Sequence, residues 1–340
     1  MTVATQELSQ FFKDKRILVT GGTGSIGTSL VSALLDYDVK HVTVFSKDDS
    51  KQYLMRRKYG AANLNFILGD IRDSKSIIDA CRNIDLVFHA AALKQIPVCE
   101  ENPLEAIKTN VIGVNNLIRA CIAGEVEKVV NISTDKVVNP INIMGITKLL
   151  TEKLIAQANY LPHNKKTAFC SVRFGNVINT RGSVILLWMD QIRKGKNITV
   201  TEPKMTRFLM TIPEAVNLIL KASYYCLGGE VFILKMNSIR MENLLNAVIA
   251  HCDRLGHKAF EIEIIGIRPG EKMSEELIFE YEKRIIWEDE ELYVILPSGE
   301  EGFYHFKHTV LQEYNSEKAS KFSEKEMINL LAYAIKDWSC

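Results

Sequence analysis

The stretch from Thr20 to Gly27, with the sequence TGGTGSIG, constrains the fold of this chain more than any other feature. It follows a short apolar run and leads directly into a helical pattern. In a strand, turn and helix of this kind, the first glycine allows the tight turn, the second lets backbone approach a pyrophosphate, and the third lets the helix pack closely on the strand. The spacing therefore predicts a dinucleotide-binding loop, with a tight turn that binds nothing as the alternative. The expected contacts are Gly21, Thr23, Gly24, Ser25, Ile26 and Gly27.

Short apolar runs alternate with helical patterns from residue 16 to about residue 175. This alternation predicts an α/β fold in which helices cover both faces of a parallel sheet, and the right-handed crossover rule makes it a Rossmann-type, doubly wound sheet. The expected strands are 16–20, 41–45, 65–68, 85–89, 128–132 and 167–173. The expected helices are 26–36, 51–59, 74–81, 104–123 and 143–158.

Beyond Gly175 the alternation weakens, which favours a smaller, interleaved C-terminal substrate lobe. The apolar run 230–234 is expected to return to the main sheet. We therefore assign residues 1–175 to a cofactor-binding Rossmann domain, with 208–240 returning to it, and 176–207 and 241–340 to the substrate lobe and a C-terminal helix. Ser323 and Glu326, spaced as a capping box, predict where that helix begins.

Composition excludes several classes of protein. The chain is 47% apolar and 24% charged with a net charge of +1, which predicts neither a nucleic-acid nor a membrane partner. The cysteines form no Cys-x-x-Cys pair and the histidines no metal-ligand cluster, so we expect no metal. The sequence shows no signal-peptide pattern and no run of ~18 uncharged apolar residues, which predicts a cytoplasmic protein without a membrane span.

The residues after the second expected strand bear on the choice of cofactor. An acidic residue there would bind an NAD ribose, whereas Ser46 and Lys47 suit the 2′-phosphate of NADP. Asp48 and Asp49 follow directly. Unless they cap the next helix, either could bind the ribose of NAD, so NAD remains the alternative cofactor. NADP is the expected cofactor. Further expected contacts are Asp70, Ile71, Ala90, Ala91, Ala92, Lys94, Asn110 and Lys148.

The run from Ser133 to Lys148 brings an acid, a base and a second lysine close together in sequence. Short-chain dehydrogenases/reductases place a catalytic pair, Tyr-x-x-x-Lys, on one helical turn, and here the tyrosine position holds Met144, four residues before Lys148. A thioether cannot exchange a proton with a hydroxyl group. Either this chain lacks the chemistry, or Asp135 and Lys136 supply it.

Six stretches together resemble the extended short-chain dehydrogenases/reductases, and within them the nucleotide-sugar dehydratases that act on UDP-N-acetylglucosamine at C4 and C6. Ser-Thr-Asp-Lys followed by Asn-Pro and the Arg-Pro-Gly-Glu-Lys motif are the most specific. The stretches are 20–27, 90–94, 109–113, 133–148, 173–184 without 178–180, and 205–208 with 268–272.

The resemblance implies a reaction and roles for its residues. Such dehydratases oxidise C4 by hydride transfer to NADP, eliminate water across C5 and C6, and return the hydride to C6. Lys136 would be the base at C5 and Asp135 the acid at C6. Without the tyrosine, Asp135, helped by Thr134, would also have to take the C4 hydroxyl proton. These roles need a neutral lysine and a protonated aspartate, which we expect burial to favour. A branch of these enzymes has methionine at the position of Met144, and Lys148 would hold the nicotinamide ribose.

The second half of the chain supplies expected contacts to a UDP-sugar. Arginine binds a diphosphate bidentately, although each cation taken alone is also explained as a solvated surface charge. The expected substrate contacts are Lys94, Asn176, Arg181, Ser183, Val184, Thr199, Arg207, Met210, Arg268, Glu271 and Lys272.

The first hypothesis is an NADP-dependent UDP-N-acetylglucosamine 4,6-dehydratase, a lyase that makes a UDP-4-keto-6-deoxy sugar for a surface glycan or a nonulosonic acid. A close variant would release a 5,6-ene, epimerise C5 or reduce such an intermediate. A different class is a cofactor-binding sensor without catalysis, and a 4-epimerase is a further rival that would use the absent tyrosine. The resemblance also implies a homo-oligomer, a dimer or larger.

Overall fold

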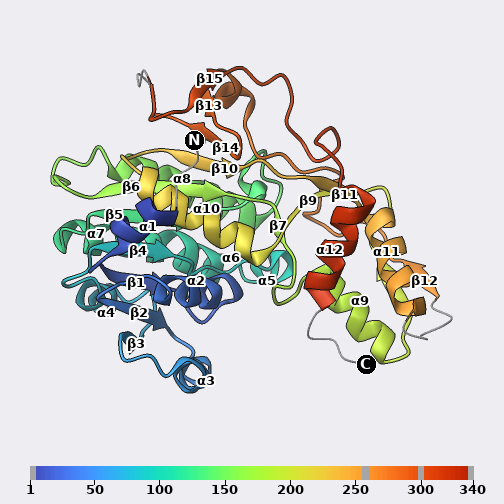
Figure 1. The fold of residues 1–340 in the computed structure, drawn as a ribbon, viewed down its shortest axis with the longest axis horizontal. Coiled ribbons are helices and arrows are strands. Elements are labelled where there is room, and N and C mark those ends of the chain that lie inside the picture. Colours follow the sequence, from blue (N-terminus) through green and yellow to red (C-terminus); the bar gives the residue numbers. More distant parts are fainter. Residues whose placement is uncertain (1–4, 255–260, 298–301, 336–340) are drawn as a thin grey trace.

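A ten-stranded sheet forms the centre of the protein in the computed structural model, which describes residues 5–254, 261–297 and 302–335 (Figure 1). The strand order is β15-β13-β14-β10-β6-β5-β4-β1-β2-β3, and neighbours from β10 to β3 pair in parallel. The Rossmann-type sheet predicted from the sequence is thereby confirmed, as is the return of residues 230–234 beside β6. The parallel strands are β1 Arg16–Thr20, β2 His41–Ser46, β3 Leu64–Leu68, β4 Leu86–His89, β5 Lys128–Ile132, β6 Ala168–Arg173 and β10 Val231–Leu234.

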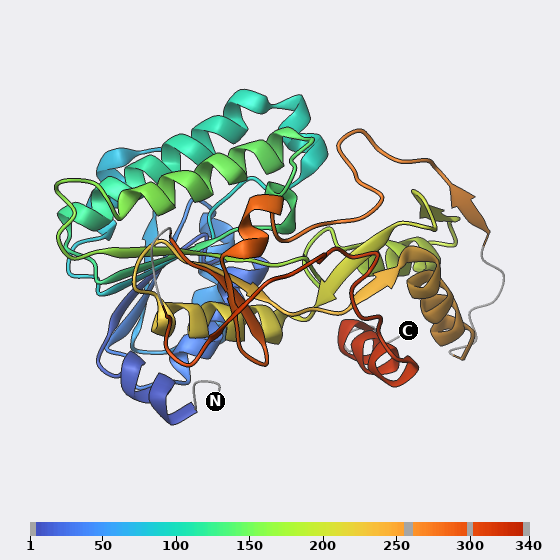
Figure 2. The same ribbon diagram turned by 90° about the horizontal axis from the view of Figure 1, so that it is seen from above.

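Helices cover both faces of this sheet (Figure 2). On one face, α2 (Ser25–Leu35) packs against α10 (Ile212–Tyr225), and α1 (Thr5–Phe12) lies on α10. On the other face lie α4 (Ser74–Ala80), α7 (Gly113–Ala123) and α8 (Ile143–Ala158), while α3 (Asp49–Tyr59) flanks β2 and β3.

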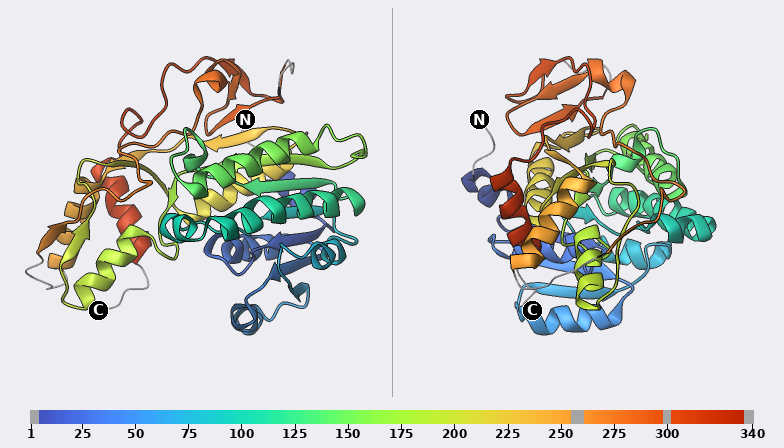
Figure 3. Two further views of the ribbon diagram at one scale, coloured as in Figure 1. Left: turned by 180° about the vertical axis from the view of Figure 1, so that it is seen from behind. Right: turned by 90° about the vertical axis from the view of Figure 1, so that its right-hand side faces the viewer.

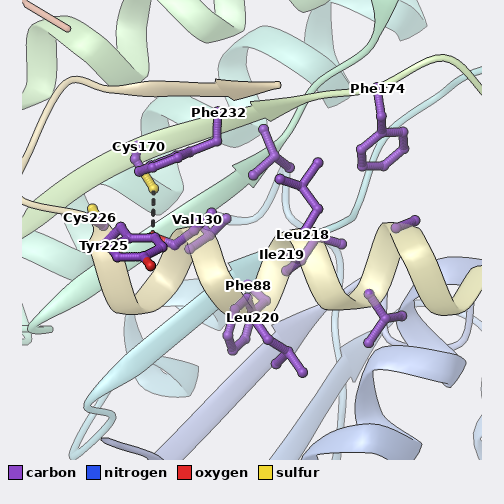
Figure 4. Packing of buried hydrophobic residues seen from close by; sticks show 14 of the residues in the cluster. Phe88, Val130, Cys170, Phe174, Leu218, Ile219, Leu220, Tyr225, Cys226 and Phe232 are labelled. Carbon is purple, nitrogen blue, oxygen red and sulfur yellow. Dashed lines mark hydrogen bonds between the residues drawn. The ribbon is translucent and has the colours of Figure 1, made fainter. Parts of the chain in front are cut away.

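The main core lies between α10 and the strands (Figure 4). Leu218 and Ile219 of α10 are fully buried, and so are Phe88 of β4 and Phe232 of β10. Burial of one such side chain stabilises the fold by about 1.5–3 kcal/mol relative to exposure. This layer therefore fixes α10 to the strands whose carboxyl ends carry the candidate site.

The segment predicted as one helix, 104–123, is interrupted. It consists of α6 (Pro103–Ala106), a π-helix η1 (Ile107–Ile112) and α7. The carbonyl oxygen of Asn110 accepts a 2.6 Å hydrogen bond from the Thr151 hydroxyl, and the Asn110 amide group bonds to the backbone of Leu93 at 2.8 and 3.0 Å. These tertiary bonds accompany the wider turn, and π-bulges occur often at functional sites.

A smaller unit with its own core stands beside the main sheet (Figure 3). It holds a three-stranded sheet, β11-β9-β7, and a two-stranded sheet, β12-β8. Ser323 and Glu326 form the predicted capping box at the start of α12, with bonds of 2.7 and 3.3 Å. The elements are β7 Asn176–Val177, β8 Ile198–Val200, β9 Thr206–Met210, β11 Ser238–Arg240, β12 Ile262–Ile264, α9 Val184–Arg193, α11 Met241–Arg254 and α12 Glu324–Ile335.

Three strands within residues 241–340 join the main sheet instead of the smaller unit. β14 (Leu292–Ile295) pairs antiparallel with β10, followed by β13 (Ile286–Glu288) and β15 (Lys307–Thr309). All four residues of β14 are buried, so this strand covers an edge that β10 would otherwise expose. The predicted assignment of these residues to the substrate lobe is therefore wrong, and the remaining division into domains stays a prediction.

Candidate active site

The glycine-rich loop connects β1 to α2, and at its glycines no side chain covers the backbone. Gly21 has a φ of +66°, and a Cβ there would lie 2.6 Å from the nitrogen of Ala91. A Cβ on Gly27 would lie 2.4 Å from the Gly21 oxygen. Any side chain at either position would clash with backbone, so the loop needs glycine. The N-terminus of α2 follows directly, and the geometry fits a dinucleotide pyrophosphate.

The residues after β2 are held by their neighbours. The Ser46 and Thr23 hydroxyls lie 2.7 Å apart, and the exposed Lys47 ammonium lies 3.9 Å from Asp70. Asp48 caps α3 by accepting a 2.9 Å bond from the backbone N–H of Lys51. The helix-cap interpretation of Asp48 is thereby confirmed, whereas contact of Ser46, Lys47 and Asp70 with a cofactor stays a prediction.

The predicted acid and base contact each other directly after β5. Asp135 is fully buried in a short 3-10 turn, η2 (Asp135–Val137). Its Oδ1 accepts hydrogen bonds from the Thr134 hydroxyl at 2.7 Å and the Lys136 ammonium at 3.0 Å. Lys136 Nζ also lies 3.3 Å from Oδ1 of Asn176 on β7. Thr134 and Lys136 line the cavity described below, whereas Asp135 lies behind them.

Lys136 is held as an ammonium. Burial lowers its pKa, but the carboxylates of Asp135 and Glu275 outweigh that effect, so the pKa stands above the usual lysine value. Burial does favour the neutral amine, but the two acidic neighbours outweigh it, so the expected neutral Lys136 is wrong for the protein alone. A base at this position needs a route by which Lys136 loses its proton.

Met144 and Lys148 lie one turn apart on α8, and both line the cavity. Met144 packs with Cys99 and Ala106 in a small apolar cluster. Lys148 donates a 2.6 Å hydrogen bond to the Ile132 carbonyl at the end of β5. Burial lowers the pKa of Lys148 to about 8. The lysine of the Tyr-x-x-x-Lys pattern is thus in place, with an apolar group where the phenol would be.

The smaller unit contributes a second wall. Arg207 on β9 donates a 2.8 Å bond to the Thr206 carbonyl, and its Nε lies 3.8 Å from Glu275. The buried Ser183 hydroxyl at the start of α9 has no hydrogen-bond partner within the described part of the chain. A buried, unsatisfied hydroxyl on a cavity wall favours a ligand contact there.

These elements enclose a cavity of about 540 Å³ between the glycine-rich loop, the end of β5, α8 and α9. A cavity of this size is typical of small-molecule sites. Predicted residues on its wall are Gly21, Gly24, Ser25, Ile26, Gly27, Ala90, Ala92, Lys94, Thr134, Lys136, Met144, Lys148, Asn176, Ser183, Val184, Thr199, Arg207, Arg268 and Glu271.

Other predicted residues lie off this wall. Arg181 donates a 2.6 Å bond to the Thr23 carbonyl in the glycine-rich loop, and Lys272 a 2.7 Å bond to the Val138 carbonyl. Met210 is buried in the main core. The predicted residues off the wall are Thr23, Ser46, Lys47, Asp70, Ile71, Ala91, Asn110, Asp135, Arg181, Met210 and Lys272.

The structure adds residues that the motifs do not single out. Gln95 and Trp188 line the cavity. Glu275 is buried beside Lys136 and Arg207. Its position four residues after Glu271 of the Arg-Pro-Gly-Glu-Lys motif is the signal that could have drawn attention to it.

Cys170, Cys226 and Glu230 lie close enough to hold a metal ion, within the residues that the structure describes. The carboxylate of Glu230 already accepts backbone N–H bonds from Leu227 and Gly228 at 2.9 to 3.0 Å. Burial raises the pKa of the Cys170 thiol well above its usual value, which disfavours a thiolate ligand. Cys170 and Cys226 lie in the apolar core shown in Figure 4, and neither the thiols nor the already bonded carboxylate supports a metal site.

No helix in the described ranges combines the length and the apolar character that crossing a bilayer requires.

The parallel sheet with a smaller unit of separate sheets is the Rossmann-like fold of the short-chain dehydrogenase/reductase epimerases. Residues 17–297 match the model of a family described as polysaccharide biosynthesis protein. The chain belongs to this family.

Comparison with individual proteins shows similarity along nearly the whole chain. An uncharacterized membrane protein of Methanocaldococcus jannaschii is 48% identical over 95% of this chain and 96% of its own length. A UDP-glucose 4-epimerase of Rickettsia bellii is 40% identical over 94% of this chain and 96% of its own length. The crystal structure of Pen from Bacillus thuringiensis superposes with a TM-score of 0.89 at 40% identity, covering 95% of this chain and 98% of Pen.

Proposed function

We propose that this protein is an NADP-dependent UDP-N-acetylglucosamine 4,6-dehydratase. The observation that carries the proposal is the 3.0 Å contact between Lys136, which lines the cavity, and the buried Asp135 behind it. An acid and a base in contact suit an elimination, in which one proton leaves carbon and another reaches the departing hydroxyl. A binding protein without catalysis has no need of this buried pair.

The C4 hydroxyl proton passes to the Thr134 hydroxyl, which lines the cavity, while Thr134 gives its own proton to Asp135 Oδ1 along their 2.7 Å bond. NADP, when bound, supplies the acceptor and later the donor of the hydride. Asp135 returns its proton through Thr134 to the C6 hydroxyl, which leaves as water. Lys136, as the neutral amine, takes the C5 proton and afterwards gives it back at C5. Met144 takes no part in proton transfer.

The choice of NADP rests on charge at the end of β2. Lys47 is exposed there, and the nearby acid Asp70 is paired with Arg72 at 2.6 Å. Two cations in this region suit a 2′-phosphate, and Asp48 is engaged as a helix cap. Titration with NADP and NAD tests this choice: tighter binding of NADP supports it, and tighter binding of NAD refutes it.

A homo-oligomer in the cytoplasm is the proposed state. Apolar side chains on adjacent α8 and η1 are exposed, including Ile146 at 49%, Leu150 at 47% and Ile112 at 49%. An apolar patch on neighbouring helices favours association. Sedimentation of the purified protein tests this: a single monomeric species would refute it.

The test of the reaction is proton NMR of the protein in D2O with UDP-N-acetylglucosamine and catalytic NADP. A C6 methyl signal with deuterium at C5 supports the proposal. A vinylic signal would show instead that the enzyme releases a 5,6-ene. An unchanged spectrum would show that UDP-N-acetylglucosamine is not the substrate. Asp135→Asn and Lys136→Ala are the matched variants, and full turnover in either would refute the roles given above.

A 4-epimerase is the second candidate, because relatives that are 40% identical carry that name. Lys136 counts against it. A C4 epimerase needs a proton acceptor only at C4, which Thr134 and Asp135 already supply, and has no use for a base at C5. Incubation with UDP-glucose decides between them. Formation of UDP-galactose without a C6 methyl signal would favour the epimerase.

A further inference from the structure

Residues 268–272, with the sequence Arg-Pro-Gly-Glu-Lys, form a tight turn at the cavity wall. The N–H of Glu271 donates a 3.1 Å bond to the carbonyl of Arg268, and Gly270 has a φ of +82°. Proline at the second position and a left-handed glycine at the third are typical of a type II turn. Arg268 and Glu271, the two ends of this turn, line the cavity. The motif thus encodes a turn whose ends face the space that a ligand would occupy.

The 268–272 turn also contacts the loop between η2 and α8. Lys272 Nζ donates a 2.7 Å bond to the carbonyl of Val138, the residue that ends η2. The carbonyl of Gly270 accepts a 2.8 Å bond from the side-chain amide of Asn142, the N-cap of α8. A Cβ on Gly270 would lie 2.9 Å from Cβ of Asn142, so the approach of the two segments requires glycine. One short turn therefore bonds to both elements that carry the proposed acid, base and cofactor lysine.

The 3-10 turn η2 is weakly held by its own bonds. Its N–H groups at Val137 and Val138 lie 3.4 and 3.2 Å from the carbonyls of Thr134 and Asp135. These hydrogen bonds are long, as is common for the poor geometry of a single 3-10 turn. The bond from Lys272 is shorter, and its charged donor makes it about twice as strong as a neutral bond. Lys272 therefore contributes more to the position of η2 than either internal bond does.

Lys272 itself does not reach the cavity. It is absent from the cavity wall, and its bond to Val138 joins positions that are 134 residues apart. The sequence predicted a diphosphate contact for this lysine, but the structure directs its ammonium to a backbone carbonyl. Its effect on a bound ligand is therefore indirect and passes through η2.

We propose that Lys272 is a positioning residue, which fixes Asp135 and Lys136 at a set distance from a diphosphate bound at Arg268. The 268–272 turn acts as a spacer, because Arg268 and Lys272 belong to the same turn. Elimination requires the acid and the base within hydrogen-bond reach of their protons, and a misplacement of about 1 Å can lower a rate about 100-fold. A fixed span between the nucleotide end and the reacting end of the substrate meets this requirement. This inference rests on the proposed dehydratase reaction.

The variant Lys272→Met tests the proposal, because it removes the donor and keeps an unbranched apolar side chain. The two readouts are kcat for formation of the C6 methyl group at saturating UDP-N-acetylglucosamine and the Kd for UDP from calorimetry. We expect kcat to fall about tenfold, because η2 is no longer fixed, while the Kd for UDP stays unchanged. A higher Kd for UDP with an unchanged kcat would overturn the proposal and show that Lys272 binds the diphosphate.

Two further variants separate the hydrogen bond from the packing of the side chain. Lys272→Arg restores a charged donor, so most of kcat should return. Lys196→Met, at an exposed position after α9, is the matched control and should change neither kcat nor the Kd for UDP. A kcat in Lys272→Arg as low as in Lys272→Met would overturn the proposal, because altered packing would then account for the loss.

A measurement on the protein alone does not depend on the reaction. Hydrogen exchange of backbone N–H groups, followed by NMR, reports how often η2 opens. Loss of a bond with a charged donor should speed exchange at Val137 and Val138 at least about tenfold in Lys272→Met. Exchange at the unaltered rate would overturn the proposal even if the enzyme acts on another sugar. Faster exchange in the variant, with no product from UDP-N-acetylglucosamine in the unaltered protein, would refute the proposed reaction and leave Lys272 as the residue that holds η2.

Discussion

The guanidinium of Arg181 lies across the glycine-rich loop and donates a 2.6 Å hydrogen bond to the carbonyl oxygen of Thr23. The backbone N–H of Arg181 also reaches the Ser25 hydroxyl at 3.3 Å. Arg181 and Thr23 are 158 positions apart in sequence, and their contact joins the smaller unit to the glycine-rich loop. Arg181 was expected at the diphosphate of the sugar nucleotide, but its bonds place it on the cofactor side.

Arg181→Gln should therefore weaken NADP binding more than UDP binding. The bond orders the loop and contributes about 1.5–3 kcal/mol; where NADP binding has to restore that order in the variant, the same energy appears as at least a tenfold rise in Kd for NADP. Isothermal titration calorimetry with NADP and, separately, with UDP measures both effects. Arg193→Gln, at an exposed position on α9, is the control and should change neither. A loss of affinity for UDP alone would show that Arg181 contacts the sugar nucleotide and not the cofactor loop.

Lys148 provides a prediction for pH dependence. Its pKa is about 8 in the folded protein because burial disfavours the ammonium, so the fraction of ammonium falls as the pH rises through 8. If the ammonium donates to the cofactor ribose, NADP affinity is highest below that pH and declines above it. Fluorescence titration at several pH values measures this. Lys148→Met should bind NADP weakly at low pH and lose the pH dependence, and an unchanged profile would exclude the ribose contact.

The parts of the fold that were predicted correctly depend on local patterns. β1 and β5 have the predicted bounds because each is a short apolar run between turn residues. Helix α8 also has its predicted bounds, with Asn142 as the cap that bonds to the N–H of Gly145 at 2.7 Å. The glycine-rich loop could be predicted because only glycine satisfies its backbone geometry.

The rest depends on contacts between distant residues, which local patterns do not encode. Glu275 lies 139 positions from Lys136, as their numbers show, and no periodicity brings them together. Without this contact, the charge state of Lys136 could not be predicted. The π-helix at Asn110 similarly coincides with a bond to Thr151, 41 residues away. Which ligand the Arg181 side chain faces depends on how the smaller unit packs against the glycine-rich loop.

Arg173 anchors a buried ion network that joins three parts of the chain. Its guanidinium is fully buried and bonds to Glu152 on α8 at 3.0 Å and to Glu282 at 2.7 Å. Arg173→Met would leave two buried carboxylates without a cation, so the free energy of unfolding should fall by about 3–5 kcal/mol. Urea denaturation measures the change.

The control for Arg173 is an exposed ion pair. Asp190 on α9 and Lys194, which follows the last residue of that helix, lie 2.7 Å apart, with side chains that are about half exposed. Lys194→Met should lower the free energy of unfolding by about 0–1 kcal/mol. Equal losses in the two variants would show that the buried network contributes no more than a surface pair.

His89, at the end of β4, gives a prediction for stability at acid pH. The ring is fully buried, Nδ1 lies 2.7 Å from the Thr20 hydroxyl, and burial lowers its pKa to about 3. In the unfolded chain the pKa of histidine is about 6.5, so between these values the unfolded state binds one proton more. This contribution to stability is present above pH ~6.5 and is lost as the pH falls toward ~3.

His89→Gln should remove that part of the acid dependence, because glutamine can still bond to Thr20 but does not titrate. The free energy of unfolding of the unaltered protein should fall by about 1.4 kcal/mol per pH unit more steeply than that of the variant between pH ~6 and ~4. Subtracting the two curves isolates His89 from the carboxylates, which titrate in both proteins. Parallel curves would mean that His89 is protonated in the folded state, and its Nε2, which has no partner in the described part of the chain, would then need an acceptor such as a bound water.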